Sequence, residues 1–243
     1  MSIFPNKLFC TSVLLLSALL FSTATYSGPL HQATRAKSVS TVKRLLQNGA
    51  DPNEKDRYRI VPLIYASRHG SYEIVRLLLK YKAKVNSADL SRKTALSYAA
   101  MFGREKIIKL LHTYGGDVMH YDKNLRTPLI YAALNGHAST VKTLLQLKSN
   151  PNFFDKYRNT ALHLAASKGY VSIVKHLTAY RAKLDKKEAR GYTPLQYATF
   201  YGHKEIIAHL LAKGANPNTG GWTALHFAAQ KGYIDIAKLY HTR

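Results

Sequence analysis

The chain has 243 residues, of which 46% are hydrophobic, enough to bury a substantial core. It carries 36 Lys and Arg against 13 Asp and Glu, so its formal charge of +23 favours acidic partners or acidic surfaces without saying which. The single cysteine, Cys10, excludes an intrachain disulfide and any metal site built from paired cysteines.

The first 24 residues have the pattern of a secretory signal peptide. Lys7 precedes an apolar run over residues 8–21, and Ser22 and Ala24 then place small side chains at the two positions that a signal peptidase reads. The run is shorter than the ~20 residues that a bilayer-spanning helix needs, so an uncleaved membrane anchor is the weaker alternative. We therefore expect residues 1–24 to be removed and the protein to be periplasmic or secreted.

The rest of the chain repeats one motif. Residues 127–137 read Thr-Pro-Leu-Ile-Tyr-Ala-Ala-Leu-Asn-Gly-His, and the step between related segments is 33 residues five times and then 30. Those segments begin at Gly28, Val61, Thr94, Thr160, Thr193 and Thr223. A fixed period of this length indicates stacked units, each too small to bury its own apolar face.

Each unit predicts two short helices. Thr127 is placed to cap the first helix, Pro128 suits its first position, and Gly136 ends it. In the second helix, apolar residues such as Val141 and Leu144 recur at helical spacing. Stacking such pairs gives one continuous core.

The motif resembles the Thr-Pro-Leu-His-x-Ala core of the ankyrin repeat, from about Gly28 to Arg243. The resemblance implies an all-α ankyrin repeat solenoid of about seven repeats, forming one domain over residues 25–243. The expected repeats lie near residues 28–55, 56–88, 89–121, 122–154, 155–187, 188–218 and 219–243. In the first, Lys37 replaces the helix-ending glycine, and the last has lost three residues before Thr223, as expected of end caps.

Signals for catalysis are absent from the sequence. It holds no Gly-x-Ser-x-Gly elbow, no phosphate loop and no His-Glu-x-x-His. Of its 11 histidines, His31, His163 and His226 share one repeat position and His137 and His203 share another, and equivalent positions of separate repeats are too far apart to ligate one metal ion. We expect no enzymatic activity, no cofactor and no metal site.

Two further positions recur through the repeats. An acid stands five residues before the Thr position, where it is expected to form a turn: Asp56, Asp89, Asp122, Asp155 and Glu188. An aromatic residue stands four residues after the Thr position: Tyr65, Tyr98, Tyr131, Tyr197 and Phe227, with Leu164 in repeat five. We expect these rings to pack between helices, and a binding stripe is the alternative.

The loops between repeats, which we call fingers, are basic and aromatic. In three of them an arginine stands where the family has a turn glycine, which invites a functional explanation. Arginine pairs with carboxylate or phosphate, and tyrosine beside it adds a stacking face. Positive charge spread over the whole molecule, as at Lys82, Lys109 and Lys142, is the alternative. The finger candidates for partner binding are Arg57, Tyr58, Arg59, Arg92, Lys93, Arg126, Lys156, Tyr157, Arg158 and Arg190.

A second candidate surface lies at the last turns of the first helices, which in the resembled family face a concave groove. Large apolar residues there favour a protein interface, unless they pack against neighbouring fingers. The groove candidates are Met101, Phe102, Leu134, Phe200 and Tyr201.

Together these patterns predict an exported, non-catalytic protein-protein interaction module or scaffold. We expect a monomer that binds an acidic protein partner through basic fingers and an apolar groove patch, with no small-molecule substrate. One alternative is binding to a polyanion such as nucleic acid, anionic glycan or a membrane surface. Another, implied by resemblance to exported bacterial ankyrin repeat proteins, is a secreted effector that acts on host proteins.

Overall fold

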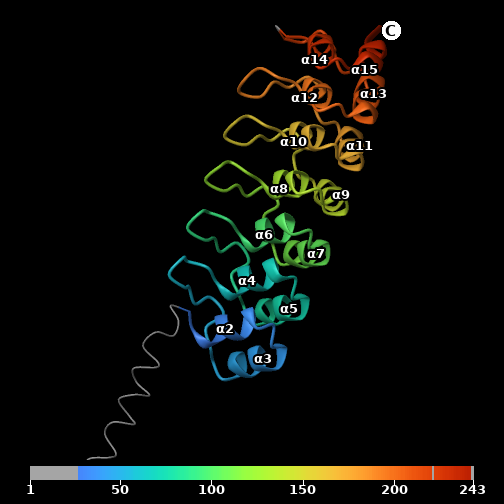
Figure 1. Ribbon diagram of the computed structural model, residues 1–243. Helices are drawn as coiled ribbons and strands as arrows, with labels where there is room; N and C mark the ends of the chain where they lie inside the picture. Colours follow the sequence, from blue (N-terminus) through green and yellow to red (C-terminus); the bar gives the residue numbers. More distant parts are fainter. Residues whose placement is uncertain (1–26, 221, 242–243) are drawn as a thin grey trace, which may run out of the picture.

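The computed structural model describes residues 27–220 and 222–241, where helices pair and stack into an elongated, gently curved solenoid (Figure 1). The predicted signal peptide, residues 1–24, lies outside the described residues. No helix in the described part is long and apolar enough to span a membrane.

Each repeat contributes an inner and an outer helix. The inner helices are α2 (Pro29–Arg35), α4 (Pro62–His69), α6 (Ala95–Met101), α8 (Pro128–Leu134), α10 (Ala161–Lys168), α12 (Pro194–Phe200) and α14 (Ala224–Gln230). The outer helices are α3 (Val39–Gln47), α5 (Tyr72–Lys80), α7 (Glu105–Thr113), α9 (Ala138–Gln146), α11 (Val171–Ala179), α13 (Lys204–Ala212) and α15 (Ile234–His241). The fingers protrude from one side of the stack, on the left in Figure 1. The prediction of an all-α solenoid is confirmed.

The inner helices begin and end where the motif predicts. The hydroxyl oxygens of Thr94, Thr127 and Thr193 each accept the backbone N–H three residues further on, at 3.3, 3.4 and 3.3 Å. After α4, Gly70 adopts φ 75°, and after α8, Gly136 adopts φ 78°. This left-handed region suits glycine, so the chain turns there toward the outer helix.

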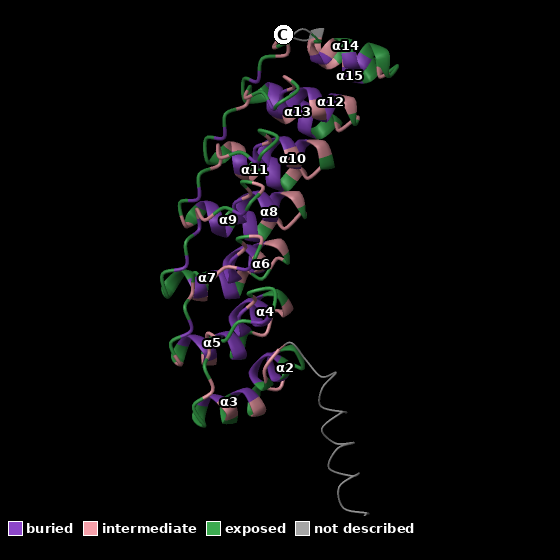
Figure 2. Ribbon diagram, turned by 90° about the vertical axis from the view of Figure 1, so that its left-hand side faces the viewer, coloured by how far each residue is buried: buried purple, intermediate pink, exposed green. Residues whose placement is uncertain are grey.

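The core runs unbroken between the two layers of helices (Figure 2). Inner-helix alanines allow close approach between repeats, and α8 packs against α6, α10 and its own partner α9. Equivalent apolar residues are fully buried along the stack, as Leu63, Leu96, Leu129, Leu162 and Leu195 show. Because each pair completes the core of its neighbours, the repeats are stable only as a stack.

The acid of each finger forms the predicted turn. Asp122 Oδ1 accepts the N–H groups of Asn124 and Arg126 at 2.8 and 2.9 Å. Asp56, Asp89 and Asp155 accept the equivalent pairs of N–H groups. The carboxylate therefore takes the place of a backbone acceptor inside the loop.

The aromatic position is tied to that acid. The hydroxyls of Tyr65, Tyr98 and Tyr131 donate to Oδ2 of the aspartate nine residues earlier, at 2.8, 2.8 and 2.5 Å. Burial first, and then the bond to the carboxylate, raise the pKa of the Tyr98 and Tyr131 hydroxyls. In these three repeats the rings pack between helices and join each finger to its inner helix, so they have a structural role.

Candidate functional site

The finger tips are exposed, and three arginines there adopt the conformation of a turn glycine. Arg59, Arg92 and Arg158 have φ values of 59°, 65° and 63°. Such values are unfavourable for a residue with a Cβ. Tyr58 and Tyr157 are exposed beside them, each under a neighbouring cation.

Positive φ values at basic residues also occur outside the fingers. In the turns after the outer helices, Lys82, Lys148 and Arg181 have φ values of 64°, 65° and 60°. The sequence reasoning missed this set, although each residue stands one 33-residue step from a glycine: Gly49, Gly115 or Gly214. Recurrence of a basic residue at a glycine position is therefore not specific to the fingers, which weakens the argument made from Arg59, Arg92 and Arg158.

Two of the finger candidates, Lys93 and Arg126, lie against aromatic rings of the inner helices. Lys93 Nζ is 5.9 Å from the ring centroid of Tyr98, and the Arg126 guanidinium is 5.9 Å from that of Tyr131. The Arg126 side chain is only 25% exposed, and its Nε lies 3.6 Å from Asp155 Oδ2 of the next repeat. Both residues contribute to contacts within the solenoid, in addition to any partner contact.

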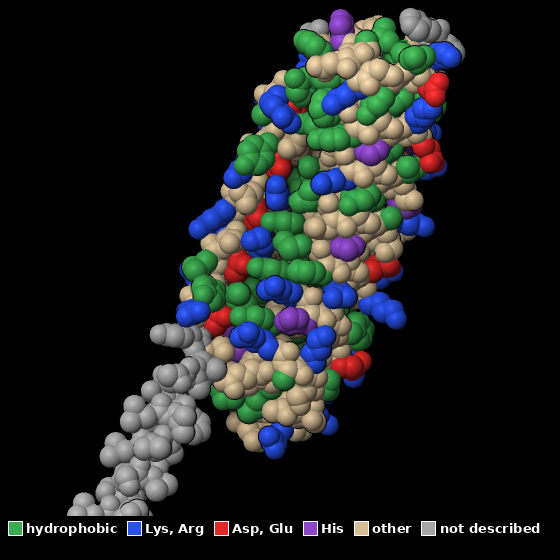
Figure 3. All heavy atoms as spheres, in the orientation of Figure 1, with side chains coloured by type: hydrophobic (Ala, Val, Ile, Leu, Met, Phe, Trp, Pro, Cys, Tyr) green, Lys and Arg blue, Asp and Glu red, His purple; other side chains and the backbone are tan. Residues whose placement is uncertain are grey.

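The groove candidates follow the inner helices as a broken row. Met101, Leu134 and Phe200 are half-buried, whereas Phe102 and Tyr201 are 38% and 51% exposed. On the face drawn in Figure 3, hydrophobic side chains form a band along the solenoid, with Lys and Arg side chains scattered beside it.

Cations lie directly over rings of this row. The Arg68 guanidinium is 5.7 Å from the centroid of Phe102, and Lys231 Nζ is 4.2 Å from that of Phe200. The combination gives an apolar surface bordered by positive charge.

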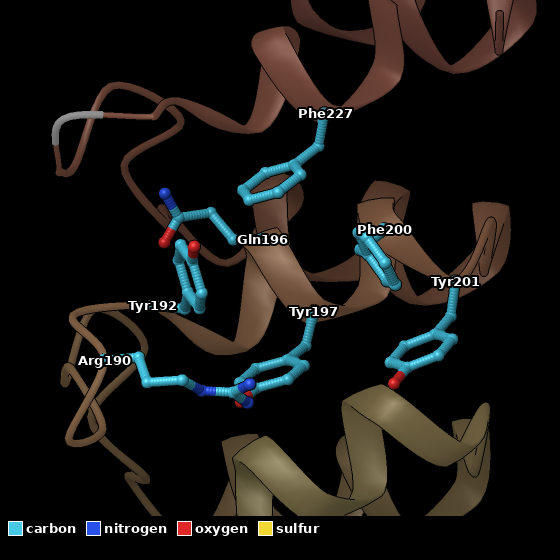
Figure 4. A pocket seen from close by; sticks show the side chains of 7 residues that line it. All are labelled: Arg190, Tyr192, Gln196, Tyr197, Phe200, Tyr201 and Phe227. Atoms are coloured by element: carbon cyan, nitrogen blue, oxygen red, sulfur yellow. The ribbon is translucent and has the colours of Figure 1, made fainter. Parts of the chain in front are cut away.

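Finger and groove meet in one pocket, between α12 and α14. Its volume is about 210 Å³, and three predicted residues line it: Arg190 from the finger, with Phe200 and Tyr201 from the end of α12. The lining is completed by residues that the sequence reasoning did not propose as a site: Tyr192, Gln196, Tyr197 and Phe227 (Figure 4). The other predicted residues do not share a pocket with these three, so the structure gathers only a C-terminal subset of the candidates.

Two basic groups near the finger and groove candidates are disfavoured as cations by burial first and by neighbouring positive charges second. Burial, followed by the nearby cations Lys183 and Arg158, lowers the pKa of Lys186. Burial, followed chiefly by Arg68, lowers the pKa of His69. Cations that disfavour one another's charge in this way are stabilised by an incoming anion.

The recurring histidines join neighbouring repeats. Nε2 of His137 lies 3.0 Å from the Met101 carbonyl oxygen, and Nε2 of His203 lies 3.2 Å from that of Ser167. Within residues 27–220 and 222–241, no three His, Cys, Asp or Glu side chains are grouped so that they could hold a metal ion. His137 and His203 thus each link the N-cap of an outer helix to the inner helix of the preceding repeat.

Comparisons with known proteins agree with this architecture. A family model described as "Ankyrin repeats (3 copies)" matches residues 30–122, 110–188 and 179–241. No curated protein matches the chain. Among solved structures, the human ASB11 ankyrin repeat domain superposes with a TM-score of 0.80 at 26% identity, over 89% of this chain and 99% of that one. The chain therefore belongs to the ankyrin repeat family.

Proposed function

We propose that this protein is an exported, non-catalytic scaffold that binds an acidic protein partner through its fingers and groove. Ankyrin repeats generally mediate protein-protein interactions. One observation carries the proposal: a basic finger residue, Arg190, lines the same pocket as the apolar Phe200 and Tyr201. Aromatic and arginine side chains in a pocket are typical of interface residues that contribute much of the binding energy.

Polyanion binding is the second candidate function. The basic turns at Lys82, Lys148 and Arg181 favour it, because they spread positive charge beyond the fingers. Nucleic acid, an anionic glycan or a membrane surface would bind with a steep salt dependence, since affinity would come from released counterions. A protein partner that presses apolar groups into the groove would retain most of its affinity at higher salt.

The groove provides the test. A pull-down with residues 25–243, followed by mass spectrometry, identifies the partner. Leu134→Ser and Phe200→Ser should then each cost about 1–2 kcal/mol of affinity, because each removes an apolar contact at the centre of the interface. Val39→Ser, which changes an exposed apolar residue of α3 outside the groove, is the matched control and should bind normally.

Urea unfolding of each variant separates lost contacts from lost folding. The groove proposal fails if both variants unfold at the wild-type midpoint and still bind the partner as tightly as before. Polyanion binding would then be the leading account.

Export rests on residues 1–24 and is a separate part of the proposal. The small residues Ser22 and Ala24 support cleavage that leaves a mature N-terminus near Thr25. Edman sequencing of protein from the producing cell should read from that residue, whereas an intact Met1 on membrane-associated protein would indicate an anchor. Pull-downs from the producing cell and from a host lysate would distinguish a resident scaffold from an effector.

A further inference from the structure

The pocket between α12 and α14 has the size and the walls to hold one side chain. Its volume of about 210 Å³ lies below the ~300–1,000 Å³ of sites that enclose whole small-molecule ligands. The centroids of Phe200 and Phe227 are 5.8 Å apart at 86°, and those of Tyr192 and Phe227 are 5.4 Å apart at 79°. Rings packed edge to face in this way present apolar walls to an inserted group.

The shortened last finger explains why the pocket occurs here. The step from Thr193 to Thr223 lacks three residues of the usual 33, and Gln196 Nε2 donates to the carbonyl oxygens of Thr219 (3.0 Å) and Trp222. These bonds hold the short finger against the start of α12. Phe227 stands at the repeat position of Tyr131 but has no hydroxyl to bond to a finger acid. Its ring borders the hollow that Figure 4 shows.

The mouth of the pocket is cationic. The Arg190 side chain is 69% exposed, its Nη2 donates to the Tyr197 hydroxyl, and its Nε lies 3.6 Å from Glu188 Oε2. A guanidinium has five N–H donors, so these two contacts leave it able to bind a further carboxylate. Lys231 adds a second cation over Phe200.

An acid beside the mouth, Glu188, belongs to the turn of the finger. Glu188 is almost fully buried, and its Oε1 accepts the backbone N–H groups of Arg190 and Tyr192 at 2.9 and 3.3 Å. The Glu188 charge offsets part of that of Arg190, so the positive charge of the rim comes from the exposed remainder of the Arg190 guanidinium and from the exposed Lys231.

We infer that this pocket takes a large aromatic or aliphatic side chain from an acidic peptide segment, with a carboxylate beside it bound by Arg190 and Lys231. The inference rests on the proposed function and names the chemistry of the partner's anchor. Apolar walls select the side chain, and the cations at the rim select the acid next to it.

Two blocked dipeptides, acetyl-Phe-Asp-amide and acetyl-Ala-Asp-amide, and one blocked amino acid, acetyl-Phe-amide, provide the test. The only tryptophan, Trp222, reports binding through its fluorescence, because its ring centroid lies 5.7 Å from that of Phe227. The Phe-Asp compound should bind the full chain saturably with a Kd on the order of 1 mM, as expected of so small a ligand. The other two should each bind at least about tenfold more weakly.

Variants locate the site. Phe200→Ser should abolish saturation, and the exposed Arg190→Gln should remove the preference for Phe-Asp over acetyl-Phe-amide while leaving the fold intact. Val39→Ser, at an exposed apolar residue of α3, and Arg76→Gln, at an exposed arginine of α5 that is paired with Glu73, are matched controls and should bind the dipeptide like the wild type.

The inference is overturned if no dipeptide saturates the wild type, or if the Ala-Asp compound binds as well as Phe-Asp. If the captured protein still depends on Leu134 in that case, the proposed function stands without this pocket. Dipeptide binding that needs Phe200 and Arg190, without any captured protein, supports the pocket and overturns the proposed function.

Discussion

In the finger that starts at Asp122, both carboxylate oxygens are hydrogen-bonded, Oδ1 to two backbone N–H groups and Oδ2 to the Tyr131 hydroxyl. One repeat later, Leu164 replaces the tyrosine, and Asp155 Oδ2 has no hydrogen-bond partner although the residue is only 1% exposed. Arg126 Nε, 3.6 Å away and itself without a hydrogen-bond partner, is the nearest charge of opposite sign.

The next repeat departs further. Glu188 replaces the aspartate, and the Tyr197 hydroxyl accepts from Arg190. In repeats two to four the acid thus accepts a hydrogen bond from the tyrosine of the same repeat. In repeats six and seven, aromatic rings and a cation lie beside a pocket instead. The same repeat position joins a finger to its inner helix where the acid and the tyrosine bond each other, and it borders a pocket in repeats six and seven, where that bond is missing.

Breaking a complete acid-tyrosine pair should have the largest effect. Asp122→Ala leaves the buried Tyr131 hydroxyl and two part-buried backbone N–H groups without their acceptor, so the free energy of unfolding should fall by about 3 kcal/mol. Urea unfolding measures it. Asp117→Ala, which removes an exposed acid that accepts from Met119 N–H, is the control and should cost less than about 1 kcal/mol. Equal losses would show that the buried pairing contributes little.

Lowering the pH should weaken the contact between repeats five and six. His163 links repeat five to the next finger through the Tyr192 carbonyl oxygen, 3.2 Å from Nε2, and burial lowers its pKa from 6.5 to about 4 against the raising effect of carbonyls and Glu188. The unfolded chain therefore takes up a proton below pH 6.5 that the folded chain does not. The stability that comes from the neutral, buried His163 is complete above that pH and is lost as the pH falls toward 4.

The free energy of unfolding should thus drop by about 2 kcal/mol from about pH 7 to pH 5 through His163 alone. Urea titrations of the wild type and of His163→Gln measure the difference between their pH profiles. His226→Gln, at the same repeat position, is the control. Identical profiles for wild type and His163→Gln would contradict the assignment.

Reversing the charge of three arginines tests whether the fingers outside the pocket between α12 and α14 also bind the partner. Arg59, Arg92 and Arg158 changed together to Glu should weaken partner binding at least about tenfold more than the same change at Lys82, Lys148 and Arg181. Both triples alter the formal charge equally and occupy the same backbone conformation. The comparison is made at ~0.15 M salt, where screening acts over about 8 Å. Equal losses would assign the effect to the field of the whole molecule.

Restoring the pair in repeat five should have the smallest effect. Leu164→Tyr places a hydroxyl nine residues after Asp155, where Tyr131 follows Asp122, and should raise the free energy of unfolding by about 1 kcal/mol. Leu164→Phe adds the ring without the hydroxyl and is the control. A gain of the same size in both variants would trace the effect to packing.

Much of the fold could be predicted from the sequence because the repeat motif contains the residues that begin and end its helices. Thr127, Pro128 and Gly136 fix where one inner helix starts and stops, and Asp122 marks the turn before it. Each of these signals acts within a few residues of the chain, so a sequence pattern can show it.

The site was harder to predict, because it depends on how neighbouring repeats differ. Arg190, Phe200 and Tyr201 were proposed from two separate surfaces, and their meeting in one pocket depends on the shortened finger above them. Two signals were available: the nine-residue spacing of acid and tyrosine, and its loss after repeat four. The bond between the two side chains appears only in three dimensions.

The series arrangement of the repeats has a mechanical consequence. The larger helix contacts join a repeat only to itself or to its immediate neighbours, as α8 does with α6 and α10. A force applied between the ends is therefore carried by every interface in turn, and a small rotation at each one adds to the next. We therefore expect the solenoid to bend as a whole, so that its groove widens or narrows while every individual interface stays close to its resting geometry.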